Sequence, residues 1–310
     1  MSTPLQLKPM SAGDILDRAI RIYRENFVAL VTIVAIVNVP LVLLQALSFL
    51  LIFPFGEGFS PTSTLQPTMI LVGVGLFVIG IIGAVFAVFE LGALTLYVSE
   101  RFMGRVITVR QAYSNAFKRG LSLVIAALLL FLALFALFML FFGAIFIPAI
   151  LAALGGSGRD SATALAGFWV VCTCVLFVPG LLGILYFYTR WTFWTQAIML
   201  ESYNSTGGLG RSWKLVKGSF WRVLGFNIAL GIMAIALTFG ASTTITFGAA
   251  FLPIPFGTML QTVLNGIIQI IIAPLQYATL TVLYYDLRIR KEGFDIQMQL
   301  QDKEPPDQNG

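Results

Sequence analysis

Six long apolar stretches alternate with shorter polar segments along the chain of 310 residues. Each stretch has 27 to 33 residues, whereas about 20 apolar residues let a helix cross the hydrocarbon core of a bilayer. The pattern predicts an all-α polytopic membrane protein with six transmembrane helices. The predicted spans are Phe27 to Phe53, Thr68 to Val98, Leu121 to Ala153, Gly167 to Met199, Val223 to Leu252 and Thr258 to Tyr285.

Composition agrees with this prediction, and the distribution of charge predicts how the helices are oriented in the membrane. Apolar residues make up 58% of the chain and charged residues 11%, a balance that soluble globular domains do not show. Of the 19 Lys and Arg residues, 18 fall on alternate polar segments, and only Arg159 falls on the others. Because cytoplasmic loops carry the positive excess, we expect both termini in the cytoplasm and the segments near Glu57, Arg159 and Pro255 outside.

The polar segments preceding the odd-numbered spans resemble one another at intervals of 97 and 96 residues. Leu16, Arg18 and Arg21 align with Leu209, Arg211 and Lys214, and the segment before the third span fits more weakly. The even-numbered spans also end alike, at Glu100, Glu201 and Asp286. A fixed period defines a building unit, here an amphipathic helix followed by a transmembrane hairpin. We expect a single membrane domain over 1–295, with repeats at about 11–107, 108–204 and 205–290. A disordered cytoplasmic tail is expected at 296–310. The three units form either a pseudo-threefold bundle or a less regular six-helix bundle.

Capping patterns predict where the amphipathic helices begin: Ser11 with Asp14, Thr108 with Gln111, and Ser205 or Thr206. Such helices lie in the membrane interface, with cations toward anionic lipids and aromatic rings at headgroup depth. They serve either as simple anchors or as lipid-sensing or partner-binding elements. The predicted lipid-contact residues are Arg18, Arg21, Arg24, Lys118, Arg119, Trp213, Lys214, Lys217, Trp221 and Arg222.

Polar side chains at membrane depth are the candidate site. An ionisable group there costs about 2.5 to 3.5 kcal/mol on insertion scales, so its presence calls for a structural or functional reason. Glu90, Arg190 and Gln276 lie ten or eleven residues before the ends of the even-numbered spans, hence at similar depths. We expect Glu90 and Arg190 to pair, directly or through water, with Gln276 and Asn38 nearby. The cluster is then either an interhelical clamp or a ligand site.

Several kinds of chemistry find no support in the sequence. The chain has no histidine, which removes the commonest general base and the commonest metal ligand. We therefore predict no catalytic residue, no metal and no cofactor, and classify the protein as not an enzyme. The net charge of +5 is explained by the orientation signal, so no nucleic-acid partner is expected.

Three segments together resemble a bacterial membrane family named for the membrane domain of glycerophosphoryl diester phosphodiesterases. They are LKPMSAGDILDRAIRIYRENF, GRSWKLVKGSFWRVLG and LYYDLRIRKEGFD, and the likeness extends from about Leu7 to Asp295. In the enzymes that give that family its name, a separate soluble domain with histidines and carboxylates performs catalysis. The resemblance therefore implies a stand-alone membrane part in the bacterial cytoplasmic membrane, without phosphodiesterase activity.

Two functional hypotheses follow. The first is a non-enzymatic membrane scaffold or accessory module that meets lipids, or a cytoplasmic protein partner, through its basic interfacial helices. The second is a carrier or channel for a lipid-derived or small polar solute, with Glu90, Arg190, Gln276 and Asn38 lining the path. Substrate, partner and oligomeric state are not specified by the sequence.

Overall fold

The structure is a computed structural model that describes residues 9–52, 67–143 and 159–294. Side chains are described for 9–48, 73–143, 175–253 and 256–294. The described residues are almost entirely helical and contain no strand. The predicted tail at 296–310 and the predicted outer segment at Glu57 lie outside the described residues.

Six helices in the described part are long and apolar enough to cross a membrane, as predicted. Their apolar side chains point outward as well as inward, which suits a lipid environment because lipid, unlike water, solvates apolar surface. The last of them continues about two turns beyond its predicted end at Tyr285. The six are α2 (Phe27–Ile52), α3 (Pro67–Phe102), α5 (Gly120–Phe142), α7 (Arg159–Arg190), α10 (Phe220–Ala249) and α11 (Ile254–Glu292).

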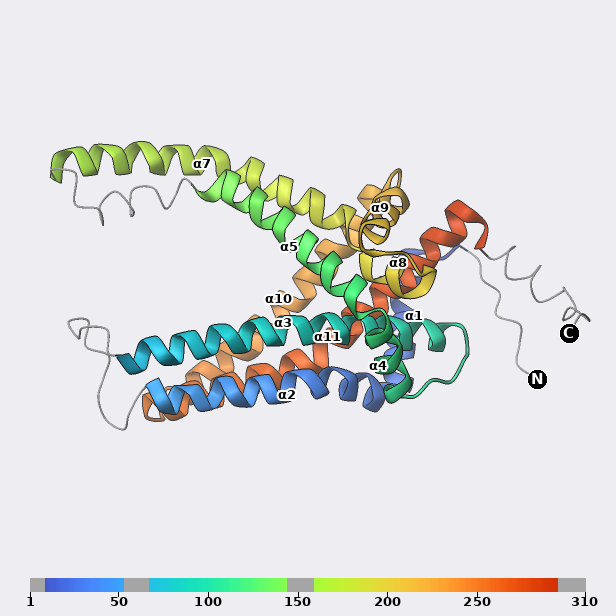
Figure 1. The fold of residues 1–310 in the computed structure, drawn as a ribbon, viewed down its shortest axis with the longest axis horizontal. Coiled ribbons are helices and arrows are strands. Elements are labelled where there is room, and N and C mark those ends of the chain that lie inside the picture. Colours follow the sequence, from blue (N-terminus) through green and yellow to red (C-terminus); the bar gives the residue numbers. More distant parts are fainter. Residues whose placement is uncertain (1–8, 53–66, 144–158, 295–310) are drawn as a thin grey trace, which may run out of the picture.

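In the described part of the chain, four shorter helices lie together at one end of the bundle, which we call the charged end (Figure 1). They are α1 (Ala12–Glu25), α4 (Val109–Lys118), α8 (Trp194–Glu201) and α9 (Ser205–Val216). The predicted capping boxes are confirmed for α1 and α4, where Ser11 and Thr108 each accept from the backbone N–H three residues on. The predicted cap of α9 was one residue too late, because Asn204 caps this helix by accepting from the Gly207 N–H at 2.8 Å.

The fourth predicted span is present as a candidate membrane span, but it is not one continuous helix. Helix α7 ends at Arg190, the chain turns through Trp191–Phe193, and α8 then carries it to Glu201. The hydroxyl of Ser212 on α9 bridges this break, because it accepts from the Phe193 N–H at 3.0 Å and donates to the Arg190 carbonyl at 2.9 Å. Ser212 is fully buried, so backbone groups freed by the break are satisfied inside the protein.

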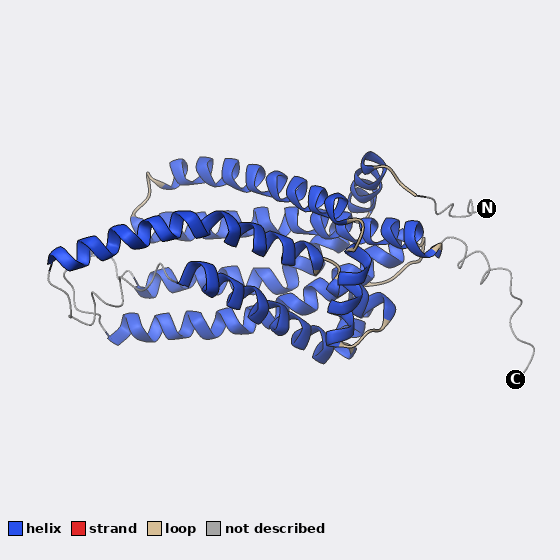
Figure 2. Cartoon of the chain, turned by 90° about the horizontal axis from the view of Figure 1, so that it is seen from above, coloured by secondary structure: helices blue, strands red, loops and turns tan. Residues whose placement is uncertain are grey.

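The long helices pack as three neighbouring hairpins, α2 with α3, α5 with α7, and α10 with α11. Helix α11 also packs along α2 and α3, whereas the α5–α7 pair diverges from these helices toward the end opposite the charged end (Figure 1). Seen from above, the long helices run broadly alongside one another (Figure 2). Glycine allows the closest approach between α2 and α11, since a Cβ at Gly266 would lie 2.6 Å from a methyl of Val42.

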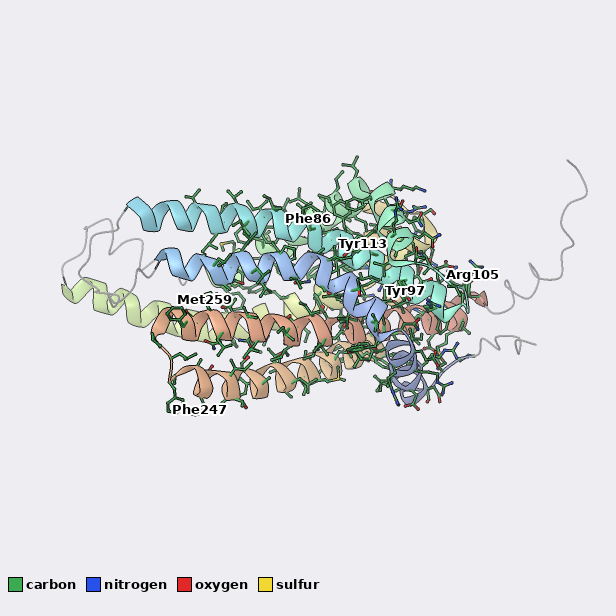
Figure 3. All side chains as sticks on the ribbon, turned by 90° about the horizontal axis from the view of Figure 1, so that it is seen from below. Phe86, Tyr97, Arg105, Tyr113, Phe247 and Met259 are labelled. Carbon is green, nitrogen blue, oxygen red and sulfur yellow. The ribbon has the colours of Figure 1, made fainter. Side chains whose placement is uncertain are left out.

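The buried core lies mainly toward the charged end. Tyr97, Tyr284 and Phe193 are its largest fully buried side chains, and Ile15 and Leu215 bring α1 and α9 into it. Figure 3 places Tyr97 and Tyr113 toward the charged end, and Phe247 and Met259 at the opposite end. Interior packing and polar contacts are therefore concentrated where the short helices cover the ends of the spans.

Candidate functional site

The predicted intramembrane cluster is only partly assembled. Glu90 on α3 is 6% exposed and accepts a hydrogen bond from Asn38 Nδ2 on α2, with Nδ2 to Oε2 at 2.8 Å. The same amide donates to the Val34 carbonyl at 3.0 Å. Asn38 therefore ties Glu90 to the backbone of the neighbouring helix. A neutral amide is the direct partner of this carboxyl.

Tyr113 on α4 lies close to this pair. Its hydroxyl donates to the Ile33 carbonyl at 2.6 Å, which fastens α4 to α2. Burial, followed by the nearby Glu90 carboxylate, raises the pKa of the Tyr113 phenol above its usual range. Tyr113 therefore remains a neutral hydrogen-bond donor at physiological pH.

Arg190 does not form the predicted direct pair with Glu90. Its Nε and Nη2 donate to the Tyr186 hydroxyl at 3.1 and 3.0 Å, and its guanidinium lies over three aromatic rings. The distances from its Cζ to the ring centroids are 5.1 Å for Tyr186, 4.9 Å for Trp213 and 5.6 Å for Phe220. These contacts lie at the break between α7 and α8. The faces of aromatic rings therefore stabilise the Arg190 cation at the end of its helix. The depth of Arg190 along the sequence does not tell whether its partner is an aromatic ring or a carboxylate.

Gln276 does not join Glu90 or Arg190. Its side chain is half-buried on α11 and forms no hydrogen bond with any residue in the described part of the chain. Of the four predicted cluster residues, only Asn38 and Glu90 are bonded to each other.

The strongest electrostatic contacts lie at the charged end. The sequence repeat pointed to Glu201, Asp286 and Arg211 but not to Glu292 or to which residues pair. Arg211 on α9 donates to Glu201 at 2.7 Å and to Glu292 at 2.7 Å. Hydrogen bonds from the guanidinium to these carboxylates raise the pKa of Arg211. Arg288 completes the group, with its Nε 3.4 Å from a Glu201 oxygen and 3.3 Å from a Glu292 oxygen. The group joins α8, α9 and α11.

A second ionic group surrounds Asp286, which is fully buried. Its carboxylate lies 2.9 Å from Arg222 Nη2 and 3.0 Å from Arg290 Nε. It also accepts from the Met10 N–H at 2.8 Å, and the Met10 carbonyl accepts from Arg222 at 2.8 Å. These contacts fasten the segment before α1 to α10 and α11. By contrast, Glu100, which the predicted repeat aligns with Asp286, forms its one ion pair within the described residues with Arg105, at 3.7 Å.

The ten predicted lipid-contact residues divide into two groups. Arg18, Arg119, Trp213 and Arg222 are half-buried and contact the protein itself: Arg18 lies over the Phe102 ring, and Arg119 donates to Ile198 and Ser202. For Arg222, whose guanidinium pairs with Asp286, lipid contact is not its main role. The remaining residues are exposed: Arg21, Arg24, Lys118, Lys214, Lys217 and Trp221.

Several hollows in the described part of the charged end are large enough for a small ligand. One, of about 750 Å³, is lined by α1 and includes Asp17, Arg21, Arg24 and Glu25. Another, of about 590 Å³, lies between the end of α4, the start of α5 and the segment after α8. A further hollow, of about 540 Å³, is lined by the ends of α3, α8 and α11 and includes Glu201 and Arg288. Among the described residues no group of His, Cys, Asp and Glu could hold a metal ion.

Residues 10–287 match the family model described as Domain of unknown function (DUF7847). The match covers most of the chain, which therefore belongs to this family. No curated protein and no solved structure matches the chain. The family's description does not refer to the phosphodiesterase-associated family, and that resemblance stays a prediction.

Proposed function

We propose that the protein is a non-enzymatic integral membrane scaffold, or accessory module, that binds membrane lipids or a protein partner at its charged end. The observation that carries the proposal is the placement of Arg21, Arg24, Lys214 and Lys217. All four are exposed on or directly after α1 and α9, helices that lead into the membrane-crossing α2 and α10. Cations at the start of a span are well placed for anionic headgroups or an acidic protein surface.

The charge distribution along the sequence supports a cytoplasmic position for the charged end and for both termini. The bacterial cytoplasmic membrane, as the location of the protein, is implied by the family resemblance alone. Trp221, 80% exposed at the start of α10, suits headgroup depth, where the amphipathic indole ring is favoured.

The three-repeat architecture forms part of the proposal. Helix α4 packs against the membrane-crossing α3, and α9 packs against α8, the short helix that follows the membrane-crossing α7. Helix α1 packs against α11. This cyclic pairing supports three units arranged as a closed ring, with the interfacial helices around one rim.

The carrier hypothesis has less support. It requires a shared polar path, yet Glu90 is bonded to Asn38, Arg190 lies among aromatic rings, and Gln276 is apart from both. The Asn38–Glu90 pair suits an interhelical clamp better than a solute site.

Native mass spectrometry of the protein released from native-membrane nanodiscs tests the two functions together. The first variant, R21Q/R24Q/K214Q/K217Q, neutralises the exposed cations. Its matched control, R21K/R24K/K214R/K217R, keeps every charge, and Glu90→Gln tests the interior. We expect anionic lipids or a protein partner to remain on the wild type, on the control and on Glu90→Gln, and to be lost from the neutralised variant.

The opposite pattern would overturn the proposal. A stoichiometric small solute present on the wild type and lost from Glu90→Gln would make the protein a carrier. Equal retention of lipids and partner by the neutralised variant would show that these four cations do not form the binding surface.

A further inference from the structure

The hollow of about 590 Å³ at the charged end has a composition that selects one kind of ligand. Lys118 and Arg119 contribute two positive charges, and Ser122, Ser202 and Asn204 contribute hydroxyl and amide groups. None of the residues lining the hollow, all within the described part of the chain, is acidic. A site with cations and neutral hydrogen-bonding groups, and without carboxylates, favours an anion with several acceptor oxygens.

The two cations are not neutralised by the protein. Lys118 is exposed and forms no hydrogen bond or ion pair with any described residue. Arg119 is half-buried and donates to the Ile198 carbonyl at 3.3 Å and to the Ser202 hydroxyl, both neutral acceptors. This differs from the neighbouring Arg211 and Arg222, whose guanidiniums face carboxylates. The positive charge at the hollow is therefore available to a ligand.

The backbone adds to this preference. Helix α5 starts at Gly120, beside the two cations, and no side chain caps its N-terminus. The N-terminal end of a helix carries partial positive charge and N–H groups that lack intrahelical partners. Ser122, in the first turn of α5, lines the hollow, so this end of the helix borders the same space.

The surroundings indicate a lipid as the source of the anion. The hollow lies at the start of a predicted span, and its lining includes the apolar side chains of Leu96 and Met199. Leu121 and Phe117, next to the lining residues, are 77% and 53% exposed and suit contact with acyl chains. Polar and charged groups beside apolar surface match the junction between a phospholipid headgroup and its chains.

We propose that this hollow binds the phosphate group of a membrane phospholipid, with Lys118 and Arg119 as the charged partners of the phosphate oxygens. Arg21, Arg24, Lys214 and Lys217 do not line this hollow. An experiment can therefore contradict the proposed scaffold function without contradicting this site, and it can contradict this site without contradicting the scaffold function. A phospholipid and a soluble phosphate would present the same phosphate group to this site, so soluble phosphate is the alternative ligand.

The test is titration of the purified full-length protein, in a neutral detergent, with dihexanoyl phosphatidylglycerol, followed by native mass spectrometry. Lys118→Gln removes the exposed cation that has no protein partner among the described residues. Arg110→Gln is the matched control, because Arg110 is an exposed cation on the same helix, α4, and does not line the hollow. We expect Lys118→Gln to raise the Kd by about tenfold, because a charge-assisted hydrogen bond is lost, and Arg110→Gln to change it less than about twofold.

A second variant tests the space instead of the charge. Ser122→Leu places a larger apolar side chain in the hollow and leaves both cations in place, so it should also weaken binding. Its melting temperature, compared with that of the wild type, shows whether the fold is intact. Unchanged lipid binding in Lys118→Gln, or equal weakening in Lys118→Gln and Arg110→Gln, would overturn the site.

Inorganic phosphate and dihexanoylglycerol distinguish the sources. Under the proposal, neither binds as tightly as the phospholipid, because one lacks the chains and the other lacks the charge. Inorganic phosphate that binds as tightly as the phospholipid, and is lost in Lys118→Gln, would overturn the lipid assignment. Dihexanoylglycerol that binds as tightly as the phospholipid would overturn the role of the phosphate.

Discussion

Asp286 and Glu90 are two buried carboxyl groups that the protein satisfies in different ways. Asp286, at the charged end, has two guanidiniums and a backbone N–H within 3.0 Å. Glu90, farther inside a span, has one amide donor, Asn38. Arginine reaches Asp286 from the ends of helices, where its own desolvation is cheapest, whereas an arginine at depth would add a second costly charge. A neutral amide also remains a suitable partner if the carboxyl takes up a proton.

The largest effect is expected from Asp286→Asn. The substitution leaves Arg222 and Arg290 close together without their shared anion, and breaking a buried pair in this way costs about 3 to 5 kcal/mol. Unfolding in detergent, followed by heat or by added denaturing surfactant, measures the loss. Glu100→Gln is the matched control, because Glu100 pairs with the exposed Arg105 at 3.7 Å and should cost less than about 1 kcal/mol. Equal losses in the two variants would contradict the contrast between the buried Asp286 and the half-buried Glu100.

Ser212→Ala tests whether the charged end depends on its charges alone. The variant leaves the Phe193 N–H and the Arg190 carbonyl without their partner at the break between α7 and α8. Loss of a buried hydrogen-bonding group of this type costs about 1 to 3 kcal/mol. We expect that loss together with faster hydrogen exchange at the Phe193 amide. Thr243→Ala serves as control, since its exposed hydroxyl donates only within its own helix, to Phe239. An unchanged exchange rate at Phe193 would contradict the role of Ser212.

The sequence revealed the spacing of apolar segments and the distribution of charge along the chain, but it did not reveal which side chains bond to one another. Apolar length predicted all six long helices, and capping chemistry predicted the starts of α1 and α4, because both signals are local. The break after Arg190 was missed because Trp191–Phe193 contains no proline or glycine; its stabilising hydroxyl comes from Ser212, on another helix. The predicted direct pairing of Arg190 with Glu90 was wrong for the same reason. Residues at equal depth on different helices can face different neighbours, and only the rotation of each helix decides which.

Glu90 and Asn38 were both predicted members of the cluster, Glu90 from its depth in the span and Asn38 as a nearby polar residue. Their hydrogen bond confirms that two of the four residues meet. The ionic groups around Glu201 and Asp286 show the reverse case. The repeat identified the acids, while Arg288 and Arg290 became recognisable as partners only once α11 was seen to continue to Glu292.

The smallest expected effect is the coupling between Glu90 and Arg190, and it separates the structure from the pair expected by depth alone. A double-mutant cycle with Glu90→Gln and Arg190→Gln should give a coupling free energy below about 0.5 kcal/mol, since the two side chains share no partner. The matched cycle with Glu90→Leu and Asn38→Leu should give about 1 kcal/mol, because each single variant removes the 2.8 Å hydrogen bond and the double variant removes nothing further. Unfolding free energies of the six variants, measured in one detergent, supply both values. A larger coupling in the first cycle than in the second would mean that Glu90 and Arg190 interact through water in the membrane, and the closed Asn38–Glu90 pair would no longer explain how the interior carboxyl is held.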